Sequence, residues 1–549
     1  MVSYEQRSPV SHAVIGALFT LAILFAPAAR GQAPAAPKFY PDDPLLREPA
    51  PHPVKKVAKR DVDDLYDFLD NSFVTPRKEG KIARQGPHPA RDANTLGDVP
   101  DNAWYTNRHY YHRMSIEELK RGPGNSTPPS TGTWRVVSAK TNGMTPGFVI
   151  EDEHKNRYVL KFDPPEYPEL ASAADVIGSK ALYALGYNTP ENYIVHFRRE
   201  NLAIGEGVTW RDAAGRKHPL TARIVGEMLK PQPKGPDGTY RGMASRYIAG
   251  NLAGPFSYEG MRTDDPNDII PHEDRRELRG LYLFAAWLNH HDTKAVNSMD
   301  SLVDENGLRY LKHYLLDFGD ILGSDGVEPK FAWSGHEYTI DGKAALVEMM
   351  TFGFDVPRWQ RADCPNYKGV GRFDSSSFDP LKWKPNYPNP AFWLMDREDA
   401  FWAAKQVAAF TDAEIRALVE TGEYSDPRAA QWISDSLIKR RDKIAAAWFS
   451  RVLPLDKFAV VDGKLTYEDL GAGQEIGNGR YSVRWTSWDR NGHATVLPDT
   501  TGTQVPEFGA DTQYLAATIQ PAGAGNDDPV TVYLRRGQTI PEVAGIDRR

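Results

Sequence analysis

The chain has 549 residues, of which 40% are hydrophobic and 25% are charged, and its formal net charge is -7. This length predicts two or three domains, and the slight acidity provides no basic face for DNA or RNA, so nucleic acid is not expected as a partner. The single cysteine, Cys364, excludes an intramolecular disulfide, so core packing alone has to stabilise the protein.

The N-terminus has the three parts of a secretory signal. Arg7 provides a basic start, residues 13–26 are apolar, and small residues follow up to residue 33. This order predicts a signal peptide over residues 1–33 and export to a periplasm or the extracellular space. An uncleaved membrane anchor is the alternative, although the apolar run is shorter than the roughly 20 residues of a membrane span. No later segment is apolar enough to span a bilayer.

Residues 34–125 form the next predicted segment, an N-terminal extension. Residues 34–60 are rich in Pro, Ala and charge and are typical of a tether,. A short helix is expected over residues 61–70. The aromatic residues of 101–111 are expected to form a strap that packs on the following domain. Gly, Pro, Ser and Thr of residues 122–132 mark the boundary,.

Strand patterns dominate residues 126–270, which we expect to form one β-rich lobe. One helix is predicted in it, over residues 168–185, ended by Gly186,. The charged residues 199–219 are interpreted as an insertion. Alternating or short apolar runs predict strands over 133–139, 148–152, 158–162, 192–196, 222–229 and 241–248,.

Helical periodicity dominates residues 271–453, which predicts a helical second lobe. The first helix spans 272–289, and a hairpin follows over 302–316 with its turn at 305–307,. Further helices are expected over 397–410, from the Thr411–Glu414 capping box to Gly422, and from Ser425 and Pro427 towards Val452,.

Residues 454–549 change character again and predict an all-β module. Alternation over 481–488, 513–520 and 530–535, separated by turn residues, indicates a small sandwich,. Trp485 and Trp488 are expected in its core, and glycan stacking is the alternative reading. The overall fold class is therefore α+β.

Three short segments carry the groups that phosphoryl transfer needs. Lys161 ends the strand YVLKFD, and a lysine in an apolar strand needs an anionic partner or a route to water,. Residues 290–297, HHDTKAVN, place Asp292 and Asn297 on one loop after a helix. Asp317 begins the tripeptide Asp-Phe-Gly after an apolar run,. Each segment taken alone could have a purely structural role. The order of all three along the chain is therefore stronger evidence for phosphoryl transfer than any one of them.

In this order the segments resemble the protein-kinase-like superfamily. They look closest to its atypical branches: the HipA-type kinases, the secretory-pathway protein kinases and the phosphoinositide kinases. The resemblance covers about residues 130–450. It implies a bilobal fold with a β-rich N-lobe over residues 126–270 and a helical C-lobe over residues 271–453. It also implies ATP or another nucleotide as donor, with Mg2+ or Mn2+.

The resemblance also implies a role for each matching residue. Lys161 would contact the nucleotide phosphates, and Asp292 would be the catalytic base. Lys294 occupies the position of a phosphate-steadying lysine. The metal ligands would be Asn297 and Asp317, with Asp320 a further metal-binding or structural carboxylate.

The sequence departs from the kinase pattern in several places. The loop KTNGMTPG retains Gly143 and Gly147 as nucleotide-covering glycines but lacks the full pattern. His291 stands where an arginine is usual, which argues against regulation by a phosphorylated loop. There is no Ala-Pro-Glu motif. The carboxylate expected to pair with Lys161 is Asp175, with Glu169 as the alternative.

The leading functional hypothesis is an exported metal-dependent phosphotransferase acting on a protein, glycan or lipid hydroxyl. The alternative is an inactive kinase-like envelope or binding protein. A glycan hydrolase with paired carboxylates, such as Asp264 with Asp265 or Asp317 with Asp320, is a third hypothesis. Zinc chemistry and an α/β-hydrolase are disfavoured, because the His-Glu-x-x-His and Gly-x-Ser-x-Gly motifs are absent,.

Overall fold

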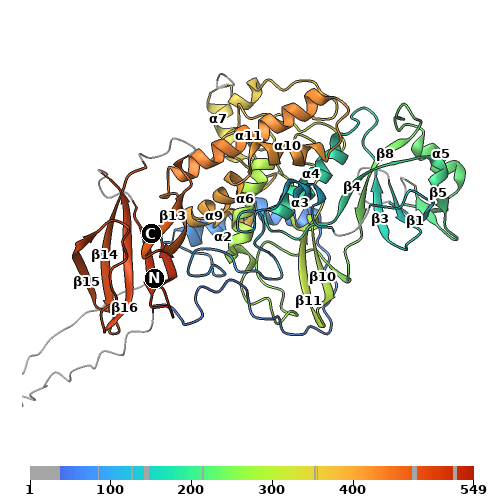
Figure 1. Ribbon diagram of the computed structural model, residues 1–549. Coiled ribbons are helices and arrows are strands. Elements are labelled where there is room, and N and C mark those ends of the chain that lie inside the picture. Colours follow the sequence, from blue (N-terminus) through green and yellow to red (C-terminus); the bar gives the residue numbers. More distant parts are fainter. Residues whose placement is uncertain are drawn as a thin grey trace, which may run out of the picture.

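The computed structural model describes residues 38–548 apart from 85, 125–127, 141–146, 213–214, 352–353, 355, 473–478 and 523–527. It is a mixed α+β structure in which the helical region lies between a six-stranded sheet and a C-terminal sheet (Figure 1). The expected signal peptide and Gly143 lie outside the described residues. No helix among the described residues has both the length and the apolar character needed to cross a membrane.

The N-terminal segment contributes three helices, α1 (Asp64–Phe73), α2 (Thr75–Ala83) and α3 (Ile116–Arg121). Asp63 caps α1 by accepting a hydrogen bond from the backbone N–H of Tyr66,. Between α2 and α3 the aromatic strap is buried as expected. Trp104 and Tyr105 pack in the helical region, where the Tyr105 hydroxyl donates to Gln406.

A six-stranded sheet follows, with the strand order β4-β8-β3-β2-β1-β5. Its alternating burial agrees with the sequence pattern, since Tyr158 and Leu160 of β3 are buried while Val159 and Lys161 face the other side,. The strands are β1 (Trp134–Lys140), β2 (Gly147–Glu151), β3 (Arg157–Lys161), β4 (Asn192–Phe197), β5 (Leu202–Ile204) and β8 (Tyr240–Arg246).

Two helices and a small hairpin accompany this sheet. Helix α4 (Leu170–Ala184) is buried over most of its length, and β6 (Thr209–Arg211) pairs with β7 (Lys217–Pro219) in the expected insertion. The predicted strand over 222–229 is wrong, because these residues form helix α5 (Ala222–Leu229). Thr221 caps it by accepting from the Ile224 N–H, and the spacing of buried Val225 and Leu229 is helical,.

The helical region is built around α6 (Arg276–Leu288), whose every residue except Tyr282 is buried. The predicted hairpin is present as β10 (Ser298–Glu305) and β11 (Leu308–Leu315), with Asn306 and Gly307 both at positive φ in its turn,. Strand β9 (Asn251–Gly254) pairs with β10. The other helices are α7 (Gly342–Met350), α8 (Pro390–Trp393), α9 (Arg397–Ala408), α10 (Asp412–Glu420) and α11 (Pro427–Phe449).

Helix starts in this region follow the capping signals. Thr411 and Glu414 form the predicted capping box of α10,. Helix α11 begins at Pro427 as expected, but Asp426 and not Ser425 caps it. The helical region and the six-stranded sheet each have their own cluster of buried apolar side chains.

The C-terminal region is a five-stranded antiparallel sheet of order β15-β14-β16-β17-β18, with a separate hairpin of β12 and β13. Leu455 and Leu465 of the hairpin share an apolar cluster with Trp485, which is fully buried as expected of a core residue. The strands are β12 (Leu455–Val461), β13 (Lys464–Asp469), β14 (Tyr481–Asp489), β15 (Ala494–Thr501), β16 (Thr512–Pro521), β17 (Val530–Arg535) and β18 (Glu542–Asp547).

Candidate active site

The side chain of Lys161 lies between two carboxylates from distant parts of the chain. Its Nζ is 3.2 Å from Oδ2 of Asp175 in α4 and 2.7 Å from Oδ1 of Asp317, which follows β11. Burial alone would lower the pKa of Lys161, but the two carboxylates outweigh it and raise this pKa above its usual value,. Lys161 is therefore fully cationic and holds two acidic groups in place.

Asp175 is the expected partner of Lys161, and the structure shows this pair. Its side chain is almost fully buried, and its Oδ1 accepts a hydrogen bond of 2.9 Å from the backbone N–H of Phe318. Burial raises the pKa of Asp175, while Lys161 acts in the opposite direction. The alternative, Glu169, instead accepts from the backbone N–H of Ser425. Asp175 thus connects α4 both to β3, through Lys161, and to the Asp-Phe-Gly segment, through Phe318.

Asp317 has a left-handed backbone with φ of 56°. This conformation is uncommon for residues other than glycine, and aspartate is among those that tolerate it best. The next side chain, Phe318, is fully buried, whereas the Asp317 carboxylate is 58% exposed. The turn therefore anchors the segment through Phe318 and presents the Asp317 carboxylate beside Lys161.

Helix α4 approaches this segment closely at Gly178. A Cβ atom at Gly178 would lie 2.7 Å from Cβ of Phe318 and 2.5 Å from Cδ1 of Ile321. Only a residue without a side chain lets α4 pack at this distance. Gly178 lies three residues after Asp175 on the same helix, so this contact also sets the position of Asp175.

Asp292 and Asn297 lie together on the loop after α6. The helix ends at Asn289 in a left-handed cap,. The Asn297 amide nitrogen donates to Oδ2 of Asp292 at 2.8 Å and to its backbone carbonyl at 2.9 Å. Burial and the nearby carboxylate of Asp320 raise the pKa of Asp292,. The amide oxygen of Asn297 is then the atom suited to a metal.

Lys294 lies beside the same carboxylate, with its Nζ 3.2 Å from Oδ1 of Asp292. Asn386, which sequence reasoning missed, donates its side-chain amide to the same oxygen at 3.2 Å. No motif surrounds Asn386, and it lies 94 residues from Asp292, so only the fold reveals this contact.

A backbone hydrogen bond joins the two halves of the site. The N–H of Leu316 donates to the carbonyl of Asn297 at 2.9 Å. This bond fixes the residue directly before Asp317 against the 3-10 turn Ala295–Asn297. The two expected metal ligands, Asn297 and Asp317, are therefore held on neighbouring backbone segments.

Gly147 is placed across from Lys161, with which it pairs between β2 and β3. Its partner in the expected nucleotide loop, Gly143, is not among the described residues. Gly147 is thus the first residue of β2, next to the lysine, and its role over the phosphates stays a prediction.

A buried charge cluster lies behind Asp292. His290 Nδ1 is 3.2 Å from Oδ1 of Asp320, and His291 Nε2 is 3.2 Å from Oδ1 of Asp325. Lys330 is 2% exposed, and its ammonium has no hydrogen-bond partner among the described residues. Burial opposes ionisation of Asp320, but the charges of Lys330 and His290 outweigh it and lower the pKa of Asp320.

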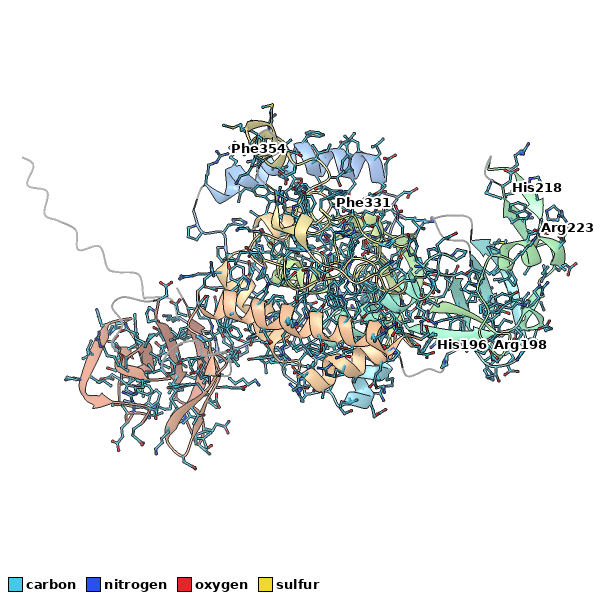
Figure 2. The ribbon with its side chains drawn as sticks, turned by 90° about the horizontal axis from the view of Figure 1, so that it is seen from above. His196, Arg198, His218, Arg223, Phe331 and Phe354 are labelled. Carbon is cyan, nitrogen blue, oxygen red and sulfur yellow. The ribbon has the colours of Figure 1, made fainter. Side chains whose placement is uncertain are left out.

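Sequence reasoning missed Lys330, because no motif marks it. Its neighbour Phe331 is about half exposed and is visible over the helical region in Figure 2. Burial lowers the pKa of Lys330, while the carboxylates of Asp320, Asp325 and Asp292 act in the opposite direction.

Helix α1 reaches the same loop from the N-terminal segment. Asp64 Oδ2 lies 3.3 Å from Nζ of Lys294, so this ammonium bridges Asp64 and Asp292. Three residues further along α1, Asp67 accepts a hydrogen bond of 2.7 Å from the Tyr387 hydroxyl. The N-terminal segment thus contributes a carboxylate beside the expected phosphate-steadying lysine.

The donor set fits a hard divalent cation that also binds a ligand. Among the described residues, no three His, Cys, Asp or Glu side chains gather as a metal cage. Mg2+ is usually held by one or two carboxylates together with substrate phosphates. Asp317 would supply the carboxylate, and the amide oxygen of Asn297 is a second hard oxygen ligand.

The acidic pair Asp264 and Asp265 has structural contacts instead. Asp264 binds Arg262 and accepts from the backbone N–H of Ala58, and Asp265 accepts from Asn267. Asp264 thus attaches Ala58 to the segment of Arg262, and Asp265 stabilises its own turn through Asn267.

Comparison with known proteins gives only weak structural similarity. No family model matches the chain, and no curated protein matches its sequence. The crystal structure of the Golgi casein kinase matches with a TM-score of 0.28 and 10% identity, over 74% of this chain and 97% of that chain. The same kinase with Mn/ADP bound matches with a TM-score of 0.27 and 11% identity, over 72% and 94%. Similarity at this level carries no argument about function, which rests on the site itself.

Proposed function

We propose that the protein is an exported, metal-dependent phosphotransferase with a bilobal protein-kinase-like fold and a sandwich-like C-terminal module. One observation supports this most directly: Lys161, Asp175 and Asp317 form a single ion cluster, although a strand, a helix and a post-strand turn contribute them. Phosphoryl transfer needs a lysine for the phosphates and a carboxylate for the metal at one place.

Each group has a defined task in the proposed reaction. Lys161 binds the phosphates of ATP or another nucleotide, and Asp317 and Asn297 hold Mg2+ or Mn2+, which neutralises phosphate charge. Asp292 orients the acceptor hydroxyl and accepts its proton. The acceptor oxygen then bonds to the terminal phosphorus while the bond to the nucleoside diphosphate breaks. The acceptor is a protein, glycan or lipid hydroxyl.

The proposal is tested by thermal unfolding of the purified chain with ATP and Mg2+ or Mn2+. A ligand that binds only the folded state raises the unfolding temperature by mass action. We expect a metal-dependent rise that Asp317→Ala abolishes and that Asp304→Ala leaves intact. Asp304 lies on the exposed part of β10, where it pairs with Arg309, and so provides a matched control. No rise with any nucleotide would refute the proposal.

A second candidate is a kinase-like envelope or binding protein without transfer activity. The pairing of Asp64 with Lys294 favours it, because the lysine expected to steady the transferred phosphate is already neutralised. This candidate predicts nucleotide binding at most, with no phosphate transferred to any acceptor. Incubation with γ-labelled ATP and Mn2+ separates the two candidates.

A further inference from the structure

A cavity of about 590 Å3 lies near the end of β3 opposite Lys161. Its wall includes the turn before β3, the last turn of α4, the residues after β8 and the outward side of β11. Cavities of about 300–1,000 Å3 are the usual size for small-molecule ligands. None of the expected catalytic residues lines it, so it is a separate site.

The charge of this cavity is opposite to that of the chain as a whole. Five cationic side chains line it, against one carboxylate, Glu191. Lys155 and Arg157 share Glu151, Arg246 pairs with Glu191, and Lys312 pairs with Glu305. The fifth cation, Arg108, donates to the carbonyls of Tyr183 and Tyr187 at 2.9 and 3.0 Å. The lining is thus predominantly cationic, in a chain whose net charge is -7.

Aromatic rings complete the lining. Tyr183, Tyr247 and Tyr314 all border the cavity, and Tyr247 is 43% exposed. The guanidinium of Arg108 lies 4.0 Å from the centroid of the Tyr183 ring. Guanidinium groups suit phosphate oxygens, and tyrosine rings pack on the flat face of a sugar or base. The lining therefore suits a small molecule that carries both a ring and phosphate groups.

The cavity also joins the three elements that carry the ion cluster. Strand β3 runs from Arg157 at the cavity to Lys161, α4 contains both Tyr183 and Asp175, and β11 runs from Lys312 towards Asp317. The segment that follows α4 is bonded to β11 at Asn188, whose side chain donates to the His313 carbonyl and whose own carbonyl accepts from the Leu315 N–H, both at 3.0 Å.

We propose that this cavity binds a small phosphorylated molecule with a ring, and that its occupancy strengthens nucleotide binding at the ion cluster. A ligand held by Arg157, Tyr183 and Lys312 fixes β3, α4 and β11 relative to one another. The relative positions of Lys161, Asp175 and Asp317 depend on the same three elements. The binding part is independent of the proposed phosphotransferase function, whereas the coupling part rests on it.

Titration calorimetry of the full chain with glucose 1,6-bisphosphate tests the binding part. The titration is repeated in the Asp317→Ala variant, so that a failure of the nucleotide site does not affect the result. We expect binding in both proteins, a dissociation constant raised roughly tenfold by Lys312→Gln or Arg246→Gln, and no change in Lys439→Gln, an exposed lysine of α11. Unchanged thermal unfolding of each variant shows that it folds.

Two further titrations complete the test: one uses inorganic pyrophosphate, and the other uses ADP with Mn2+. Weaker binding of pyrophosphate than of the sugar bisphosphate supports the role of the rings, and equal binding overturns it. Tighter ADP binding in the presence of glucose 1,6-bisphosphate supports the coupling, and by reciprocity ADP must tighten the sugar phosphate by the same factor. Binding of neither probe, or affinities unchanged in both cavity variants, overturns the site.

Discussion

The carboxylate of Asp175 accepts a hydrogen bond from the backbone N–H of Phe318, 2.9 Å away and 143 residues further along the chain. The same carboxylate receives the ammonium of Lys161. We expect Asp175→Ala to destabilise the fold by about 2 kcal/mol, because it leaves a buried N–H and a buried ammonium short of an acceptor. Chemical denaturation measures this loss.

A second variant, Asp175→Asn, separates the hydrogen bond of this carboxylate from its charge. Asp175→Asn keeps an acceptor for the Phe318 N–H but removes the charge beside Lys161. We therefore expect Asp175→Asn to recover most of the stability but not the metal-dependent shift of the unfolding temperature with ATP. Equal loss of stability in both variants would show that the hydrogen bond contributes nothing.

Because α4 packs so closely at Gly178, we expect a larger residue there to disturb the packing beside the ion cluster. Gly178→Ala places a methyl group against Phe318 and Ile321, which we expect to destabilise the protein by about 2 kcal/mol and to weaken stabilisation by nucleotide. Gly226→Ala in α5 is the matched control, since a Cβ there meets no atom within 4 Å. Alanine favours a helix over glycine, so the control should be neutral or slightly stabilising. A neutral Gly178→Ala would contradict the close approach.

The Asp64–Lys294 pair predicts a variant with stronger nucleotide binding. Asp64→Asn removes one of the two carboxylates that Lys294 contacts and leaves Asp292 in place. Because Asp64 is also more than half exposed, we expect the dissociation constant to fall by only about twofold to fivefold,. Calorimetry with ATP and Mn2+ at low salt measures it. Asp70→Asn changes the charge of the same helix and, among the described residues, makes no ion pair with Lys294. A matching gain in Asp70→Asn would assign the effect to net charge.

Because Lys330 and Asp320 are buried close to each other, we expect substitutions at the two positions to have non-additive effects on stability. We expect Lys330→Met to destabilise the protein by about 3 kcal/mol, because Asp320 then keeps a buried charge with less compensation. Adding Asp320→Asn should recover part of that loss, and a double-mutant cycle measures the coupling. Lys343→Met, at an exposed position of α7, is the control. Additive losses would mean that the two charges act independently.

The ion pairs of Asp456 connect the C-terminal region to α9, and we expect their contribution to stability to be lost in acid. It lies in β12, 2.8 Å from Nζ of Lys405 in α9 and 2.8 Å from a guanidinium nitrogen of Arg548. Burial opposes its ionisation, but these two cations outweigh burial and lower its pKa to about 2. A pKa below the ordinary value means that its stabilising contribution is complete above about pH 4 and is lost as the pH falls through about 2.

The measurement compares the free energy of unfolding of the unchanged protein and Asp456→Asn between pH 7 and pH 2. We expect a difference of about 3 kcal/mol at pH 7 that disappears near pH 2. Asp304→Asn should show a much smaller trend, because Arg309 lowers the pKa of Asp304 but the pair is exposed to solvent,. A difference that stays constant across this range would exclude Asp456 as the titrating group.

Sequence periodicity predicted most elements, because apolar residues recur with the period of the strand or helix whose face they bury. The strand ending at Lys161, the helix carrying Asp175 and the hairpin before Asp317 all follow from it. The strand expected over 222–229 was wrong for a physical reason: a short apolar run suits either element, and the Thr221 cap decided for a helix,.

The parts of the site that the sequence did not reveal are those made by distant segments. Asp64 meets Lys294 across 230 residues, and Asn386 meets Asp292 across 94. The burial of Lys330 likewise depends on its surroundings and not on its neighbours in sequence. The resemblance supplied the order of the site residues, but only the fold shows which carboxylate, Asp175 or Glu169, Lys161 contacts. Their catalytic roles stay predictions.

The first and last described segments pack on the same C-terminal sheet. The Phe39 ring lies 5.5 Å from that of Tyr514 and 5.4 Å from that of Tyr533, and the Ile546 N–H bonds to the Thr95 carbonyl. A peptide joining the two ends would therefore bridge one surface without crossing the molecule. The architecture is suited to circular permutation, with new ends in the hairpin of β6 and β7, whose His218 lies at the far end of the β-rich region in Figure 2. In such a permuted chain, a fused tag would lie at this far end of the β-rich region.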